Sequence, residues 1–113
     1  MSVDEANLHM LKEVIGDDLK EIIDAFLTTS PEILGQVKLS IEIKDAAGVQ
    51  LHSHTLKGSS ANIGATKLPA LCAELESKAK EGVVTDDFNR MYQQIETEMQ
   101  NVFRHLKQFL QSF

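Results

Sequence analysis

Apolar side chains recur every three or four residues along most of this chain, and this spacing limits the possible folds more than any other feature. It is the period of one face of an α-helix, whereas a half-buried strand would alternate apolar and polar residues. The longest register runs through residues 85–110 and consists of Phe88, Met91, Tyr92, Ile95, Met99, Val102, Phe103, Leu106 and Leu110. The sequence therefore predicts an all-α fold.

Capping and turn residues divide this pattern into separate helices. Asp4 is a suitable N-cap for a short first helix that ends at Gly16. Longer helices joined by short connections are predicted over residues 17–41, 46–63, 67–79 and 85–110. Four such helices indicate an antiparallel up-down-up-down four-helix bundle, with the short additional N-terminal helix lying across one end. The chain has 113 residues and no obvious linker, so we expect residues 1–113 to form one domain.

Pro31 falls inside the second predicted helix. A proline in a helix interior removes one hydrogen bond and bends or breaks the helix. The apolar stripe stays in phase on both sides of Pro31, which favours one kinked helix over two separate ones. Ser30 followed by Pro31 also resembles an N-cap and a first helical residue, so a break at this point is a second possibility.

Charge and composition exclude several classes of partner. The chain has 11 basic and 17 acidic residues and a net charge of -6, which argues against nucleic acid. No apolar run approaches the roughly 20 residues that span a bilayer, so no membrane association is expected. Cys72 is the one cysteine and no apolar leader precedes the first helix, which predicts a cytoplasmic protein.

Two histidines stand two positions apart in the third predicted helix. At about 100° per residue, Val49, Leu56 and Ile63 lie within roughly 40° of one another and define the buried face. His52 lies about 40° from the centre of that face, whereas His54 lies about 160° away and points outward. The two rings therefore cannot share a ligand.

The neighbours of His54 suit an accessible, reactive ring. Ala47, Gly58 and Ala61 are small, so no bulky side chain covers the imidazole. Glycine in a helix costs roughly 1 kcal/mol relative to alanine, and Gly58 therefore indicates close approach by another molecule. Lys57 can place an ammonium beside a group attached to the ring. Spacing alone leaves a second interpretation open, in which His54 is a solvated surface histidine and Lys57 is incidental.

The other histidines are interpreted as packing residues. His52 is expected to be half-buried, with one ring nitrogen bonded to a neighbouring helix. His9 and His105 are expected to be interface or surface residues of the first and last helices.

The segment HTLKGSSANIGA begins at His54 and is continued by Leu68, Leu71, Cys72, Leu75 and Glu76. This pattern resembles the signature of histidine-containing phosphotransfer (HPt) domains, and the resemblance extends over nearly the whole chain. It implies a four-helix bundle that displays a single phosphorylatable histidine. The initiating Met1 and the complete first helix favour a free-standing bacterial member of the family.

The resemblance also implies a function in a phosphorelay. Family members accept a phosphoryl group from the aspartate of a receiver domain and pass it to the aspartate of another receiver. Carried over by position, His54 is the phosphoacceptor, Lys57 is the phosphate-side lysine, and Gly58 is the small residue that admits the receiver, with Ala61 on the same surface. The expected partners are receiver domains of hybrid histidine kinases and response regulators, and the expected state is a monomer.

No cofactor or metal site is predicted for the chain itself. The sequence contains no Gly-rich phosphate loop, Walker lysine or kinase signature, so we expect a phosphocarrier without kinase activity. The helix that carries His54 has no carboxylate near that ring. Magnesium is therefore expected in the acidic pocket of the receiver partner.

Further residues are candidates for secondary roles. Leu51 is an apolar side chain beside His54 on which a receiver could dock. Lys67, Glu76 and Lys80 would border the site if the fourth helix packs alongside the third, and Glu76 would then orient the ring. The alternative for each of these three is a solvated charged face.

Three other functions compete with the phosphocarrier. A helical adaptor could bind receiver or kinase domains without being phosphorylated. The dimerisation segment of a sensor kinase also carries an exposed histidine, but an acidic residue usually follows that histidine, whereas Thr55 follows His54. A metal-binding bundle is weakened by the placement of His52 and His54 on opposite faces.

Overall fold

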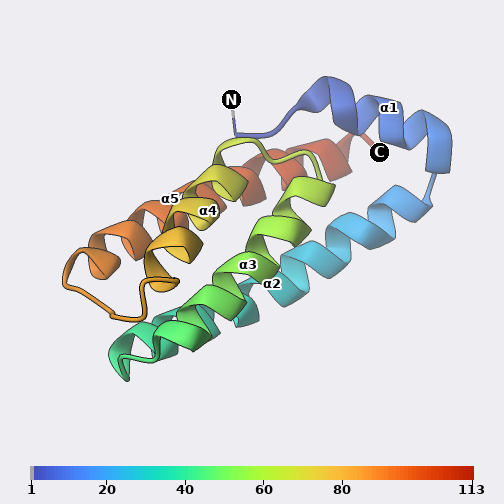
Figure 1. Cartoon of the computed structure of the whole chain (residues 1–113). Helices are drawn as coiled ribbons and strands as arrows, with labels where there is room; N and C mark the ends of the chain where they lie inside the picture. Colours follow the sequence, from blue (N-terminus) through green and yellow to red (C-terminus); the bar gives the residue numbers. More distant parts are fainter. Residues whose placement is uncertain (1) are drawn as a thin grey trace.

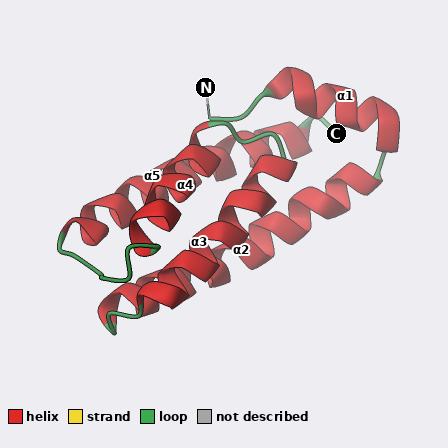
Figure 2. Cartoon of the chain, in the orientation of Figure 1, coloured by secondary structure: helices red, strands yellow, loops and turns green. Residues whose placement is uncertain are grey.

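The computed structural model describes residues 2–113 as helices joined by short connections (Figure 1). The elements are α1 (Glu5–Ile15), α2 (Asp18–Glu42), α3 (Ala46–Asn62), α4 (Lys67–Ala79) and α5 (Asp87–Gln111). Figure 2 shows that the remaining described residues are loops and turns. The predicted all-α class is confirmed, and the helix bounds agree with the predicted ranges to within two residues.

Helices α2 to α5 form a closed ring of neighbours. Helix α3 packs against α2 and α4, and α5 packs against α4 and α2. Successive helices run in opposite directions, and α1 lies across the end of the bundle where α2 begins (Figure 1). This is the arrangement that the predicted up-down-up-down bundle requires.

Aspartate side chains cap the first and third helices, and the first of them is the predicted Asp4. The Asp4 side chain accepts a hydrogen bond from the backbone N–H of Asn7 at 3.1 Å, and Gly16 ends α1 with a φ of 59°. The Asp45 side chain likewise accepts from the N–H of Gly48 at 3.0 Å. These bonds satisfy backbone donors that the first turn of a helix leaves free, which explains why the two helices begin at these points.

Helix α2 continues through Pro31 without a break. Ser30 Oγ donates to the carbonyl of Phe26 at 2.5 Å, and the hydroxyl groups of Thr28 and Thr29 make the same bond to carbonyls four residues earlier. Pro31 removes the backbone hydrogen bond to the carbonyl of Leu27, and hydroxyl groups that bond back to their own helix in this way are often found where a helix bends. The interpretation of α2 as one helix is confirmed.

The core lies between the four long helices and contains the predicted apolar stripes. Two side chains that continue the apolar spacing of the first and second helices lie outside the core. Val14 is 74% exposed and Ile22 is 44% exposed. The reason for Val14 is that α1 crosses the end of the bundle, so only a narrow face of it, centred on Leu8, meets other helices.

The segment before α1 is fastened to the turn between α3 and α4. The N–H of Asp4 donates to the carbonyl of Gly64 at 2.8 Å, and the N–H of Thr66 donates to the carbonyl of Ser2 at 3.1 Å. Val3 is fully buried between these bonds. This isolated bridge was not predicted, because pairing across about sixty residues leaves no local pattern in a sequence.

Candidate functional site

The orientation of α3 follows from one buried face. Val49, Leu56 and Ile63 are all at most 1% exposed, as the helical wheel predicts. Ser53 and Ser60 are also buried and donate to carbonyls of their own helix. Because this face packs against α2 and α4, the opposite face of α3 points away from the bundle.

His54 stands on that outer face. Its side chain is 62% exposed, and its Nδ1 atom lies 2.9 Å from Oε2 of Glu76 on α4. An ionised carboxylate can only accept a hydrogen bond, so Nδ1 carries the proton. In the neutral ring, the lone pair is then on Nε2, which makes no hydrogen bond within residues 2–113. The exposed position predicted for His54 is confirmed.

Glu76 is the centre of the polar cluster. Its side chain is 9% exposed, and its Oε1 atom accepts from Lys57 Nζ at 2.7 Å while Oε2 accepts from His54. The hydrogen bond from Lys57 is the main cause that lowers the pKa of Glu76, and the bond from His54 adds to it against the opposing effect of burial. Glu76 is therefore an ionised carboxylate that holds the Lys57 ammonium and the His54 ring of α3, so it does not belong to a solvated face.

Gly58 lies one turn after His54 on the exposed surface. A Cβ atom added to this glycine would meet nothing within 4 Å. The fold itself therefore gives no steric reason for a glycine here, which agrees with the prediction that another molecule approaches this point. Ala61 is also exposed, one further turn along α3.

A surface pocket of about 450 Å³ extends from His54 toward the start of α3. It is lined by Ala47, Gln50, Leu51, His54, Glu76 and Lys80. Leu51 is 59% exposed at its edge. Three of the four secondary candidates, namely Leu51, Glu76 and Lys80, are therefore brought to the site.

Lys67 does not belong to this site. It lines a different pocket, between α4 and α5. Lys67 precedes Glu76 by nine residues, which at 100° per residue places it about 180° away on the helix, whereas Lys80 is about 40° from Glu76. This spacing was available in the sequence and would have excluded Lys67 once Glu76 was placed against His54.

The remaining histidines lie elsewhere. His52 is half-buried. The ring of His9 packs edge-on against Phe109 at 5.3 Å, and His105 Nδ1 is 3.9 Å from Oε1 of Glu5, so both residues lie where α1 meets α5. Within the described residues, no three His, Cys, Asp or Glu side chains are grouped so that they could hold a metal ion. No helix of residues 2–113 is long and apolar enough to span a membrane.

Comparisons with known proteins identify the family of the chain. The model of the Hpt domain family matches residues 21–109. A phosphorelay intermediate protein of Dictyostelium discoideum, rdeA, is 30% identical over 89 residues. This match covers 79% of the present chain but 35% of the Dictyostelium protein, so the chain spans about a third of that relative.

Solved structures show the same fold over the whole chain. Histidine-containing phosphotransfer protein B from Pseudomonas aeruginosa superimposes with a TM-score of 0.92 and 30% identity, covering 99% of this chain and 96% of that one. The HPT domain of a Shewanella sensor hybrid histidine kinase has a TM-score of 0.81, 21% identity and 98% and 95% coverage. At that lower identity the second likeness concerns the fold alone.

The family model covers residues 21–109, so the chain belongs to the Hpt domain family. Its helical bundle is a histidine-containing phosphotransfer domain of the kind found in phosphorelay signalling.

Proposed function

We propose that Nε2 of His54 accepts a phosphoryl group from the aspartyl phosphate of a receiver domain and passes it to the aspartate of another receiver. One observation carries this proposal, namely the 2.9 Å contact between His54 Nδ1 and Glu76 Oε2 on a ring that is 62% exposed. This contact selects the tautomer whose lone pair is on Nε2, and that lone pair is the nucleophile.

The transfer step follows from this tautomer. A bond forms between Nε2 and phosphorus while the bond from phosphorus to the donor aspartate oxygen breaks, and the aspartate leaves as a carboxylate. The proton on Nδ1 remains on the ring, hydrogen-bonded to Glu76. The negative charge of Glu76 then offsets the positive charge that the imidazole gains, and the reverse sequence delivers the group to the next receiver.

Lys57 and Gly58 complete the proposed phosphate environment. Lys57 Nζ is bonded to Glu76 at 2.7 Å and lies on the turn that follows His54, where its charge offsets that of an incoming phosphoryl group. Gly58 leaves the space one turn from His54 open, so that the receiver loop bearing the aspartate can approach. Ala61 is a further small, exposed residue on the same face as Gly58. Leu51 and Lys80 line the pocket on the other side of the His54 imidazole.

The proposed partners are receiver domains of hybrid histidine kinases and of response regulators. Hpt domains relay phosphate between receiver domains, and the exposed Leu51 gives such a partner an apolar contact at the edge of the site. Magnesium, which helps phosphoryl transfer by balancing charge, is proposed to be bound by the receiver.

Phosphotransfer to a defined residue tests the proposal. Incubation with a phosphorylated receiver domain should label the protein with an acid-labile, alkali-stable phosphoryl group. The label should be lost in His54→Gln and kept in the matched control His52→Gln, which removes the neighbouring half-buried histidine.

Label that survives in His54→Gln would refute the assignment. An adaptor that binds receivers without accepting phosphate predicts no label on the wild-type protein and equal signalling by His54→Gln. Measuring receiver binding by the same variant separates the two functions, because the phosphocarrier should keep binding while losing transfer.

A further inference from the structure

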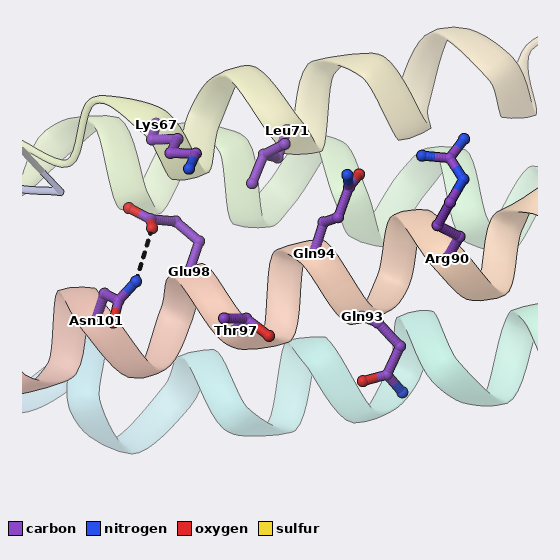
Figure 3. A pocket seen from close by; sticks show the side chains of 8 residues that line it. All are labelled: Lys67, Leu71, Arg90, Gln93, Gln94, Thr97, Glu98 and Asn101. Carbon is purple, nitrogen blue, oxygen red and sulfur yellow. Dashed lines mark hydrogen bonds between the residues drawn. The ribbon is translucent and has the colours of Figure 1, made fainter.

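A second pocket, shown in Figure 3, shares no lining residue with the pocket at His54. It lies between α4 and α5, has a volume of about 360 Å³, and is lined by Lys67, Leu71, Arg90, Gln93, Gln94, Thr97, Glu98 and Asn101. None of these residues takes part in the proposed phosphotransfer site. The volume is sufficient for a small molecule.

Glu98 forms the buried acidic part of this pocket. The residue is 3% exposed, and its Oε1 atom accepts a hydrogen bond from Asn101 Nδ2 at 3.2 Å (Figure 3). Its Oε2 atom is buried and has no hydrogen-bond partner within residues 2–113. Buried carboxylate oxygens are normally paired, because leaving one without a donor forfeits its hydration without compensation. This oxygen is therefore available to a hydrogen-bond donor on a bound molecule.

Two cations line the same pocket without neutralising Glu98. Lys67 and Arg90 are exposed, and neither makes an ion pair in the part of the chain that the structure describes. Figure 3 shows Lys67 extending from α4 toward α5 above the Glu98 carboxylate, and Arg90 extending from α5 toward α4 at the other end of the pocket. The lining thus combines one buried anion with two flexible cations.

We propose that this pocket binds a small zwitterion, specifically a free α-amino acid with an acidic side chain. The ammonium group would donate to Oε2 of Glu98, and the two carboxylates would pair with Lys67 and Arg90. The lining carries two positive charges and one negative charge, and a ligand with one ammonium and two carboxylates has the complementary set. Gln94 and Thr97 supply further polar groups, and Leu71 contacts the aliphatic part of the ligand.

A ligand ammonium reaches the buried Oε2 only if a neighbouring side chain moves. Lys67 lines the same pocket, and its long, exposed side chain is able to make such a movement. The same movement brings the ammonium of Lys67 to the outer edge of the pocket, where it meets a ligand carboxylate. The proposed ligand site is therefore distinct from the phosphotransfer surface. Ligand binding there is a second function, in addition to phosphotransfer.

Titration of isotope-labelled protein followed by amide NMR tests this site. L-Glutamate should produce saturable shifts confined to α4 and α5. Glutarate, which lacks the ammonium, and diaminobutane, which lacks the carboxylates, should bind at least about tenfold more weakly, a factor that corresponds to about 1.4 kcal/mol.

Variants assign the binding to the named residues. Glu98→Gln preserves shape and the bond to Asn101 but should weaken L-glutamate binding at least about tenfold. Arg90→Gln, at an exposed position that does not endanger folding, should weaken it as well. The matched control Glu96→Gln removes a glutamate two positions away, on the α2-facing groove of the same helix, and should bind like the wild type.

Several outcomes would overturn the proposal. Absence of saturable shifts with L-glutamate, or shifts that persist in both Glu98→Gln and Arg90→Gln, would show that no such site exists. If Lys67 instead closes onto Glu98 in solution, Lys67→Met will destabilise the protein as much as Glu98→Gln and no ligand will bind. Phosphotransfer to His54 should remain normal in all these variants, so failure here is distinguishable from failure of the proposed function.

Discussion

At His54, the two ring nitrogens have different environments. Nδ1 is bonded to the nearly buried Glu76, whereas Nε2 has no partner among the described residues. Glu76 also holds Lys57, so a single carboxylate positions the proposed nucleophile and the proposed phosphate-side cation together. Glu76 acts through these neighbours, which makes it a positioning residue in the proposed mechanism.

Glu76→Gln should slow phosphotransfer. A glutamine can still accept from Nδ1, but the hydrogen bond to a charged group is stronger than a neutral one by about 1 kcal/mol. A loss of this size corresponds to roughly a fivefold slower transfer. Stopped-flow transfer from a phosphorylated receiver measures the rate, and Glu74→Gln on the exposed side of α4 is the matched control. Equal rates for wild type and Glu76→Gln would contradict the positioning role.

The same carboxylate should make stability depend on pH. The pKa of Glu76 is lowered in the folded protein from its ordinary value of 4.5, chiefly by Lys57. Its stabilising contribution is therefore present above the unfolded-state pKa and is lost as the pH falls through the folded-state pKa. Denaturant unfolding at a series of pH values should show the wild type losing stability below about pH 4.5 faster than Glu76→Gln. If the stability of the wild type and of Glu76→Gln falls in parallel with pH, the contacts of Glu76 with Lys57 and His54 do not contribute to the free energy of unfolding.

At the scale of single helices, α3 combines two requirements on opposite faces. One face buries Val49, Leu56 and Ile63, and the other presents His54 and Gly58 to the outside. The buried face sets the rotation of the helix, and this rotation displays the histidine. Gly58 contributes nothing to packing, because the space around it is open.

Substitutions at Gly58 should separate stability from transfer. Gly58→Ala should stabilise the protein by about 0.5 to 1 kcal/mol, because alanine is the better helix former and its Cβ meets no atom. Gly58→Phe should leave the fold intact and slow phosphotransfer, because the ring would stand where the receiver approaches. Gly35→Phe in α2 is the matched control, since the space around Gly35 is also open. Unchanged transfer in Gly58→Phe would remove the steric argument.

At the scale of the whole molecule, two pockets lie on different sides of the ring formed by α2 to α5. The pocket at His54 borders α4 on its α3 side, and the pocket at Glu98 lies on its α5 side (Figure 3). Helix α1 crosses the end of this ring and is held by the buried Leu8, by the ring of His9 against Phe109 and by the bridge of Val3 to Ala65. These contacts connect the N-terminal segment to α5 and to the turn between α3 and α4.

Leu8→Ala should test how firmly α1 is integrated into the fold. Removing this fully buried side chain should lower the free energy of unfolding by about 2 to 5 kcal/mol, as is usual when a leucine is cut back in a packed core. Val14→Ala is the control on the same helix and should change stability by less than about 0.5 kcal/mol, because Val14 is exposed. Urea unfolding measures both. Equal effects would mean that α1 is not packed as described.

The sequence by itself determined the helices, the N-cap at Asp4, and the outward direction of His54. These features depend on spacing within one helix, and the helical period converts spacing into direction without knowledge of any neighbour. Only the tertiary structure decided that Glu76 reaches Nδ1 of His54, that Lys67 lies in the other pocket, and that Val14 remains exposed. Each of these depends on how one helix is rotated and shifted against another, and packing of the whole bundle sets that relation.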